Sequence, residues 1–181
     1  YLNSLEQTKS IFLVTNGQEP DMIQKLQDED ALPTQLYLST NAADYESFMR
    51  INKPRYDDSW DRWNRTLGML KDLNTRTVLR ITLIRDYNDQ KESIPAFAEM
   101  FRKASPHFIE IKSYMHIGRS TNRLEHANML EMEEVKKFSE EIAKQSKMFS
   151  IMDESIVSRI SILQNNERFI DRFIPTYANT N

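Results

Sequence analysis

The chain has 181 residues, of which 39% are hydrophobic and 28% are charged, and its formal net charge is -3. These values are typical of one soluble domain. No stretch approaches the roughly 20 uncharged apolar residues that a membrane-spanning helix needs, and residues 1–10 lack the basic and apolar segments of a signal peptide. A membrane or secreted protein is therefore a poor interpretation, and we expect a cytoplasmic protein with no membrane partner.

Short runs rich in branched apolar residues alternate with longer helical patterns, which is typical of strand–helix units and a parallel sheet. The expected strands lie at residues 11–14, 36–39, 78–84 and 108–112. The expected helices lie at residues 20–27, 44–49, 59–73, 93–103 and 132–147. Ser59 is expected to cap the third of these helices.

Two weaker extended runs follow these elements. Residues 148–152 could continue the sheet, and residues 156–163 alternate enough to form an edge strand. From residue 164 to residue 181 the chain is polar with scattered aromatic residues, so we expect a partly ordered tail. The predicted organisation is one α/β domain of residues 1–163 followed by the tail of residues 164–181.

Three of the expected strands have one apolar and one polar face, because side chains alternate between the two faces of a strand. The polar positions are Tyr37, Ser39, Arg80, Thr82, Glu110 and Lys112. If helices cover the apolar face, the polar face lines a lumen or cleft, since isolated buried charge is costly. An antiparallel sheet with one solvated face would give the same alternation without a function. Arg80 and Glu110 are expected at similar depth on adjacent strands, where they either pair or contact a ligand.

The sequence contains few cysteine or histidine residues that could bind a metal ion. It contains no cysteine, which excludes disulfides, thiolate catalysis, iron–sulfur ligation and cysteine-based zinc sites. The three histidines, His107, His116 and His126, do not have the spacing of metal ligands. We therefore assign no metal to this chain.

Four segments of the chain occur in a distinctive order and spacing: residues 12–17, 32–39, 75–83 and 108–118. Together they resemble the 4-demethylwyosine synthase family of radical S-adenosylmethionine enzymes, more closely its archaeal than its fungal form. The resemblance implies a partial (β/α)6 barrel, similar to a TIM barrel, of which this chain holds the carboxyl-terminal strands and helices. Another radical S-adenosylmethionine family with a similar half-barrel is the alternative among enzymes, but it would lack the segments 33–37 and 112–116.

The resemblance also implies an activity and its partners. The family condenses pyruvate carbons with the N1-methylguanosine next to the anticodon of tRNA-Phe, which forms 4-demethylwyosine. S-adenosylmethionine is cleaved reductively at the enzyme's 4Fe-4S cluster, which receives its electron from a donor protein. The resulting radical abstracts hydrogen from the substrate methyl group. We expect a monomer.

The family's cluster-binding cysteines, Gly-Glu-Pro segment and proposed Schiff-base lysine precede the part that this chain resembles. No catalytic residue is therefore assigned to this chain, and we expect it to be inactive alone. It would be either the remainder of a longer enzyme or a non-catalytic tRNA-binding or scaffold relic.

By the same resemblance, the S-adenosylmethionine pocket is expected to contain Thr15, Asn16, Ser39, Asn41 and Arg80. Hydroxyl and amide groups suit ribose and amino acid groups, and arginine suits a carboxylate. Turn capping is the alternative for Thr15, Asn16 and Asn41. Beyond the last parallel strand, the expected substrate contacts are Lys112, Tyr114 and His116. Tyr114 would stack on an extruded base or pack as a rim aromatic, and a surface position is the alternative for His116.

Residues 101–126 carry five lysines and arginines against two glutamates, in a chain whose net charge is negative. Such a local excess suits phosphate contacts with RNA. Arg119 and Arg123 are the first candidates for these contacts, and Lys53, Arg55 and Tyr56 form a second set. The alternative is a solvated loop.

Overall fold

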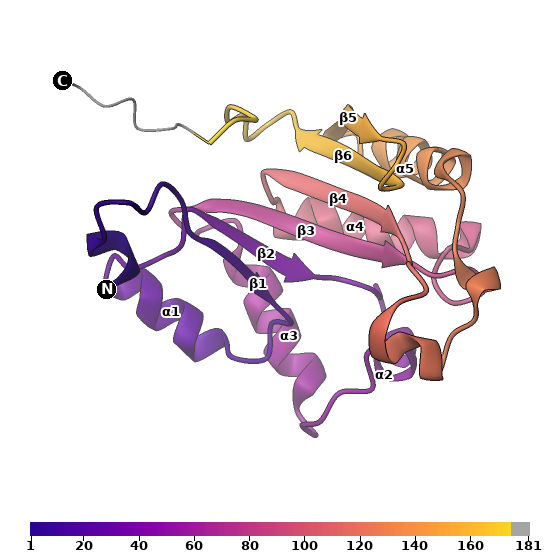
Figure 1. Ribbon diagram of the computed structural model, residues 1–181, viewed down its shortest axis with the longest axis horizontal. Helices are drawn as coiled ribbons and strands as arrows, with labels where there is room; N and C mark the ends of the chain where they lie inside the picture. Colours follow the sequence, from indigo (N-terminus) through magenta and orange to yellow (C-terminus); the bar gives the residue numbers. More distant parts are fainter. Residues whose placement is uncertain (175–181) are drawn as a thin grey trace.

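The computed structural model describes residues 1–174, which form a six-stranded mixed sheet and five α-helices (Figure 1). The strands are β1 (Phe12–Thr15), β2 (Gln35–Ser39), β3 (Arg76–Leu83), β4 (Phe108–Ser113), β5 (Phe149–Ser155) and β6 (Ile160–Asn165). The helices are α1 (Pro20–Asp28), α2 (Tyr45–Asn52), α3 (Ser59–Met69), α4 (Ile94–Ala104) and α5 (Met132–Ser146). Four 3₁₀ helices complete the described elements: η1 (Leu2–Ser4), η2 (Lys91–Ser93), η3 (Gly118–Asn122) and η4 (His126–Asn128).

The strand order is β1-β2-β3-β4-β6-β5, and the first four strands are parallel neighbours in chain order. Each crossover therefore advances in the same direction across the sheet. Because such crossovers are right-handed, their helices lie on the same face. This layer consists of α1, α3, α4 and α5, each in contact with the next; in Figure 1, α4 and α5 lie behind the sheet and α1 and α3 below β1. The other face of β1–β4 remains open to ligands.

The predicted apolar strand faces are confirmed. Leu79, Ile81 and Leu83 of β3 are fully buried, and they belong to one core with Phe97 and Phe101 of α4. Alternation along β3 thus turns its apolar side toward the helices. The polar side of the same strand faces the open side of the sheet.

Helix α3 contributes the aromatic part of this core. Trp63 is 1% exposed, its ring stacks on that of Trp60 at 5.3 Å between centroids, and Leu67 and Leu70 lie on the same side. The predicted cap is wrong: Asp58 occupies the N-cap position, and the Ser59 hydroxyl instead donates to the carbonyl of Tyr56 at 2.5 Å. The bond back to Tyr56 holds the turn that enters the helix.

The carboxyl-terminal strands differ from the prediction. β6 is an inner strand, antiparallel to both β4 and β5, and β5 is the edge. Alternation reports the two faces of a strand and carries no information about its neighbours, so it could not place residues 156–163 within the sheet. The chain reverses after β5 and inserts β6 beside β4.

The segment after β6 lies along the amino end of β3. The buried guanidinium of Arg76 donates to the carbonyl groups of Asp171, Arg172 and Phe173 at 2.6 to 3.1 Å. Of the predicted tail, residues 175–181 lie outside the described residues. None of the described helices combines the length and apolar character that crossing a bilayer requires.

Candidate functional site

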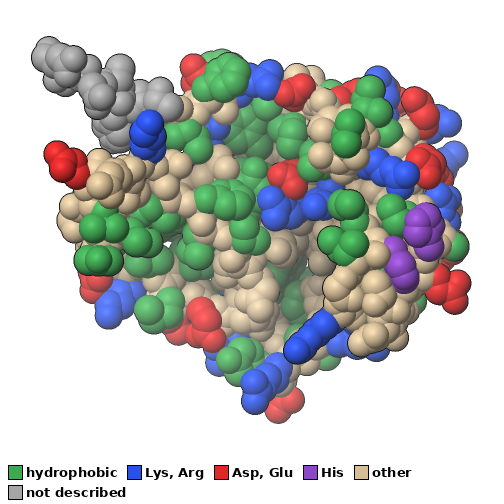
Figure 2. Space-filling model, in the orientation of Figure 1, with side chains coloured by type: hydrophobic (Ala, Val, Ile, Leu, Met, Phe, Trp, Pro, Cys, Tyr) green, Lys and Arg blue, Asp and Glu red, His purple; other side chains and the backbone are tan. Residues whose placement is uncertain are grey.

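The open face of the sheet carries the polar residues that the alternation predicted. Arg80 lies directly opposite Glu110, and Thr82 opposite Lys112, on the parallel strands β3 and β4. Arg80 donates to both Glu110 carboxylate oxygens, at 2.8 and 3.4 Å, and its guanidinium carbon lies 4.5 Å from the ring centroid of Tyr37. Figure 2 shows this face from the front, with basic side chains near its centre. Of the two roles predicted for Arg80 and Glu110, mutual pairing is the one the structure shows.

Tyr37 lies against this pair, which affects the pKa of its phenol. Burial, and then the negative charge of Glu110, raise the pKa of Tyr37 to about 12. The phenol is therefore protonated at physiological pH, where it can donate a hydrogen bond but cannot act as a base. The ring also packs edge-on against Phe12 of β1, at 4.6 Å between centroids.

A cavity of about 430 Å³, here called the amide cavity, opens at the carboxyl ends of β1 and β2. Its lining consists of Asn16, Gln18, Ser39, Asn41, Phe48, Asn52, Lys53, Pro54, Arg55 and Tyr56. The structure thus brings together three of the five residues predicted for the cofactor pocket. Thr15 and Arg80 do not line this cavity. The Thr15 hydroxyl accepts the Gly17 N–H at 3.0 Å, which is the predicted turn-capping alternative.

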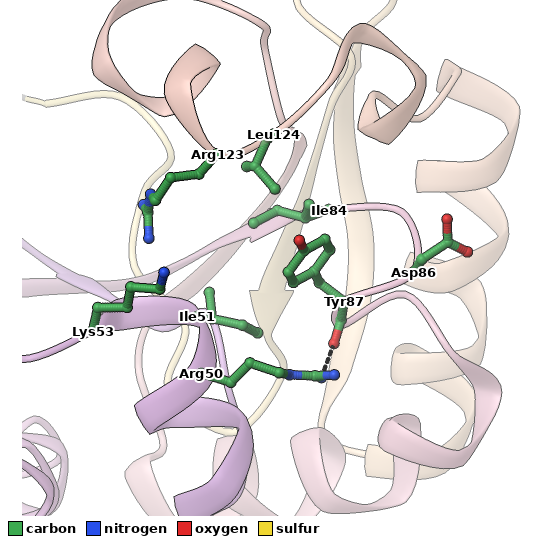
Figure 3. A pocket seen from close by; sticks show the side chains of 8 residues that line it. All are labelled: Arg50, Ile51, Lys53, Ile84, Asp86, Tyr87, Arg123 and Leu124. Carbon is green, nitrogen blue, oxygen red and sulfur yellow. Dashed lines mark hydrogen bonds between the residues drawn. The ribbon is translucent and has the colours of Figure 1, made fainter.

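A second cavity of about 480 Å³, here called the cationic cavity, lies at the carboxyl end of β3 (Figure 3). It is lined by Arg50, Ile51, Lys53, Ile84, Asp86, Tyr87, Arg123 and Leu124. Two of the predicted RNA contacts, Lys53 and Arg123, meet here, and Lys53 also borders the amide cavity. Arg55 lines the amide cavity, whereas Arg119 is exposed on η3 and lines neither.

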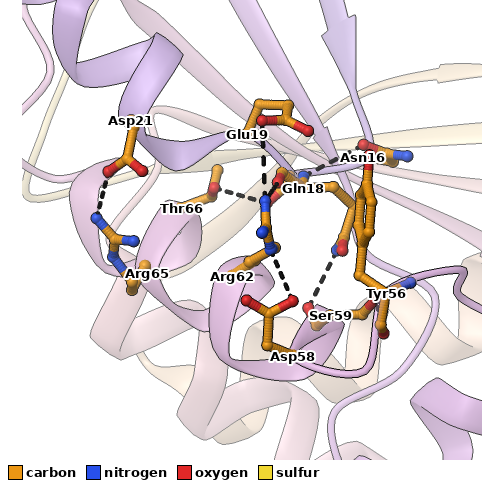
Figure 4. Close-up of polar contacts among 11 residues, drawn as sticks. Asn16, Gln18, Glu19, Asp21, Tyr56, Asp58, Ser59, Arg62, Arg65 and Thr66 are labelled. Carbon is orange, nitrogen blue, oxygen red and sulfur yellow. Dashed lines mark hydrogen bonds and ion pairs between the residues drawn. The ribbon is translucent and has the colours of Figure 1, made fainter.

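The loop after β1 holds Asn16 and Gln18 at the amide cavity through bonds to α3 (Figure 4). The Thr66 hydroxyl donates to the carbonyl of Gly17 at 2.8 Å, and Arg62 donates to the carbonyl of Gln18 at 3.2 Å. Gly17 has φ +75°, and a Cβ there would lie 2.7 Å from the Cδ1 atom of Leu38. A glycine is therefore required for the close approach of the loop to β2 and α3.

Gln18 is a functional candidate that the sequence did not indicate. Its side chain is 8% exposed, and its Nε2 donates to the carbonyl of Ser59 at 3.1 Å. Its Oε1, by contrast, is buried without a hydrogen-bond partner in the described structure. An unpaired buried acceptor is costly, so a ligand that donates to it would gain binding energy. The only signal in the sequence was its place three residues beyond the end of β1.

Asn41 combines a structural bond with its place on the cavity wall. Its Oδ1 accepts the Thr82 N–H at 3.0 Å, and its carbonyl accepts from the Asn88 side chain at 2.9 Å. Asn16 similarly accepts the Gln18 N–H at 3.2 Å. The capping alternative thus describes what these amide oxygens do within the fold, while both residues still line the cavity. No hydrogen bond occupies the Ser39 hydroxyl in the described residues.

Of the three predicted substrate contacts, Lys112 lies within β4, whereas Tyr114 and His116 follow it. Lys112 is half-buried on the open face. Tyr114 is 4% exposed, clustered with Ile51, Ile84 and Leu124, and its hydroxyl lies 3.2 Å from Nδ1 of His116. The packed position is therefore the one found for Tyr114, and its ring has no free face on which a base could stack. Its burial also explains how α2 and the loop after β4 are held together.

The described residues contain no group of three or more histidines, cysteines, aspartates or glutamates arranged to hold a metal ion. Because the whole chain lacks cysteine, it offers no thiolate ligand to an iron–sulfur cluster. The residues of this chain therefore do not fit such a cluster.

Structural comparison identifies proteins that share this fold. Coproporphyrinogen III oxidase from Escherichia coli, a radical S-adenosylmethionine enzyme, shares the fold with a TM-score of 0.53 at 13% identity, over 87% of this chain and 35% of that chain. TYW1 with a lysine-pyruvate adduct bound matches with a TM-score of 0.76 at 39% identity, over 88% of this chain and 48% of that chain. The crystal structure of archaeal TYW1 matches with a TM-score of 0.69 at 35% identity, over 88% of this chain and 47% of that chain.

Sequence comparison gives the particular relatives. Residues 103–165 match the family model for wyosine base formation. The S-adenosyl-L-methionine-dependent tRNA 4-demethylwyosine synthase of Pyrococcus abyssi is 38% identical over 86% of this chain and 45% of its own length. The enzyme of the same name from Methanocaldococcus jannaschii is 41% identical over 88% of this chain and 48% of its own length. These matches confirm the resemblance: the chain is homologous to the 4-demethylwyosine synthases, and it spans less than half the length of these relatives.

Proposed function

We propose that this chain forms the carboxyl-terminal part of the half-barrel of a radical S-adenosylmethionine enzyme that makes 4-demethylwyosine on tRNA-Phe. The observation that carries the proposal is the amide cavity, which lies at the strand ends of a sheet homologous to those synthases. Parallel α/β sheets bind their ligands at that end. In the complete enzyme, pyruvate and N1-methylguanosine would be the substrates.

The amide cavity fits S-adenosylmethionine by its chemistry. Among residues 1–174 the buried Oε1 of Gln18 has no hydrogen-bond partner, and it would accept a hydrogen bond from an amino or hydroxyl group. The Ser39 hydroxyl and the side chains of Asn16 and Asn41 line the same space. When bound there, the cofactor, together with a 4Fe-4S cluster reduced by an electron donor protein, would supply the radical chemistry.

The chain's own residues would bind and orient in this reaction. Asn16, Gln18 and Ser39 would hold the cofactor, while the Arg80–Glu110 pair keeps the open face polar beside them. Arg80 uses two of its five donors on Glu110, so we assign it to that pair rather than to the cofactor carboxylate. Lys112, on the open face, would attract the carboxylate of pyruvate as a point charge.

Contacts with tRNA are proposed for the basic residues at the same end of the fold. Lys53 and Arg123 line the cationic cavity, Arg55 lines the amide cavity and Arg119 lies on the exposed η3. Backbone phosphates are the natural partners of such side chains. His116, next to the buried Tyr114, would lie near the target base.

The iron–sulfur cluster lies outside the chemistry of this chain. No cysteine is available to bind it, so its ligands would belong to the remaining part of the enzyme. We therefore expect the 181 residues alone to be inactive, and the complete protein to act as a monomer.

A strain that lacks its own 4-demethylwyosine synthase provides the test. The coding sequence with everything upstream of Tyr1, and the 181-residue chain alone, are expressed in parallel, and 4-demethylwyosine in tRNA-Phe is measured by mass spectrometry. We expect the modified base only with the longer product, whose upstream sequence should encode a cysteine triplet. No modified base from either, with tRNA binding retained, would instead establish a non-catalytic relic.

A further inference from the structure

The cationic cavity brings together side chains from three separate segments of the chain. Arg50 and Lys53 come from the last turn and the end of α2, Asp86 and Tyr87 from the loop after β3, and Arg123 from the end of η3 (Figure 3). The floor of the cavity is apolar, because Ile51, Ile84 and Leu124 line it. A closed apolar floor beneath charged groups lowers the local dielectric and strengthens their attraction to an anion.

The charges in this cavity are unbalanced. Three basic side chains and one carboxylate line it, and in the described part of the chain neither Lys53 nor Arg123 takes part in an ion pair. The Asp86 carboxylate points away from both of them in Figure 3. Like charges that converge without a counter-charge are unfavourable unless an anion joins them.

Arg50 has a different place from the other two cations. Its guanidinium donates to the carbonyl of Tyr87 at 2.7 Å and lies 5.7 Å from the centroid of that ring. These contacts fix Arg50 against Tyr87, along the lower wall of the cavity in Figure 3. Lys53, at the end of α2, and Arg123, at the end of η3, lie on the left of the same view with their charged ends directed toward each other. Arg50 thus supplies a fixed positive charge, whereas the other two can close on a ligand.

The position of Lys53 is set by the backbone. Lys53 ends α2 in the left-handed conformation, with φ 45°, while its N–H donates to the carbonyl of Met49. A cation at a helix end also interacts favourably with the helix dipole. That interaction does not account for Arg123, which reaches the same cavity from a segment 70 positions further along the chain.

We propose that the cationic cavity binds a single phosphodiester group of the tRNA backbone, held jointly by Lys53 and Arg123 above Arg50. The inference rests on the proposed tRNA substrate and adds Arg50 to the predicted contacts. The fork of an arginine suits two phosphate oxygens, and a lysine ammonium contributes a point charge. Because Lys53 also borders the amide cavity, the phosphate would lie next to the space proposed for the cofactor.

The test measures tRNA binding by the complete protein as a function of salt. The variants are Lys53→Gln, Arg123→Gln and the double variant, with Lys71→Gln as a control that removes an exposed lysine ahead of β3. We expect each single variant to weaken binding roughly five- to tenfold, and the double variant to cost less than the product of the two. The slope of log affinity against log salt should fall by about 0.9 in total, as for one phosphate contact.

Two results would overturn the inference. If both single variants bind tRNA as the Lys71→Gln protein does, the cavity makes no phosphate contact. If the losses multiply and the slope falls by about 1.8, the two side chains bind separate phosphates. Circular dichroism of each variant checks that the fold is retained.

A second arm separates this inference from the proposed function. Inorganic phosphate is titrated into the complete protein by calorimetry, at constant ionic strength. If the unaltered protein binds no tRNA, the proposed substrate is wrong. If the same protein binds inorganic phosphate and both single variants lose that binding, the cavity is a site for free phosphate. The inference that its phosphate belongs to tRNA would then be rejected.

Discussion

Arg80 and Glu110 stand at the same level of two neighbouring parallel strands, with Arg80 Nε 2.8 Å from Oε1 of Glu110. The Arg80 side chain is 25% exposed and that of Glu110 only 9%, so the pair is largely removed from water. Such a pair contributes little net stability while intact, but removal of one partner leaves a buried charge unpaired. The intact pair therefore adds little to the free energy of unfolding. Its main effect is that loss of either partner would destabilise the polar side of the sheet.

Substitution of either partner should be much more damaging than substitution of both. We expect Arg80→Met to lower the free energy of unfolding by about 2 to 3 kcal/mol, because Glu110 then loses its partner, and Arg80→Met with Glu110→Met to cost less. Urea unfolding followed by circular dichroism measures both. The exposed pair of Arg65 and Asp21 is the control, since Arg65→Met should change stability by less than about 1 kcal/mol. If the loss of unfolding free energy in the double variant equals the sum of the losses in Arg80→Met and Glu110→Met, the two residues are not coupled.

Gly17 should tolerate no side chain. Its φ of +75° and the 2.7 Å approach of a Cβ to Leu38 both oppose Gly17→Ala, which we expect to cost about 1 to 3 kcal/mol. Gly68 is the matched control: nothing lies within 4 Å of a Cβ there, and Gly68→Ala in α3 should stabilise by about 0.5 to 1 kcal/mol. Thermal unfolding of the two variants should therefore shift in opposite directions. Equal shifts would show that the loop after β1 can relax.

The unpartnered oxygen of Gln18 gives a prediction for cofactor binding. Gln18→Met keeps the volume but removes the Oε1 acceptor, together with the Nε2 bond to Ser59, so we expect S-adenosylmethionine to bind about tenfold more weakly to the complete protein. Gln18→Glu keeps an acceptor and should retain more of the affinity. Isothermal titration calorimetry without a reductant measures binding independently of turnover. Unchanged affinity in the Gln18→Met protein would remove Gln18 from the proposed pocket.

His107 should make stability depend on pH. Burial, followed by the nearby charges of Arg168 and Arg76, lowers the pKa of His107 from 6.5 to about 4, and its Nδ1 accepts the N–H of Thr77 at 3.1 Å. Between these two values the unfolded chain binds a proton that the folded chain does not. The contribution of neutral His107 to the free energy of unfolding is therefore fully present above pH 6.5 and is lost as the pH falls toward 4.

The matched variant for this dependence is His107→Asn, whose amide oxygen can accept from Thr77 but does not titrate. We expect the unaltered protein to lose about 2 kcal/mol more than this variant across that interval, allowing for solvent screening. Urea unfolding at a series of pH values gives the comparison. Parallel curves for the two proteins would mean that His107 is protonated equally in both states.

The alternation of side chains was sufficient to predict which faces of β3 and β4 are apolar, because burial on a strand repeats every second residue. It could not predict the neighbours of β6, since hydrogen bonding between distant strands leaves no trace in a local pattern. Local patterns also predicted only those site residues that follow directly from a strand. Asn16, Ser39 and Asn41 were found because they follow strands, which bring them to one end of the sheet.

The residues that were missed depend on contacts between distant segments. Arg50 belongs to the cationic cavity only because α2 packs beside the loop after β3, and nothing around it in the sequence indicates this. The competing roles of Arg80 were also undecidable, since pairing with Glu110 and contact with a ligand require the same strand position. Distances between side chains settle such alternatives.

Because Lys53 lies between the two cavities, binding in one affects binding in the other. One ammonium group borders both the amide cavity and the cationic cavity, so an occupant that draws it to one side withdraws it from the other. Whatever factor the first ligand imposes on the affinity of the second, the second must impose on the first. Loading of the two cavities is therefore reciprocal, and the order in which their ligands arrive leaves the final equilibrium unchanged.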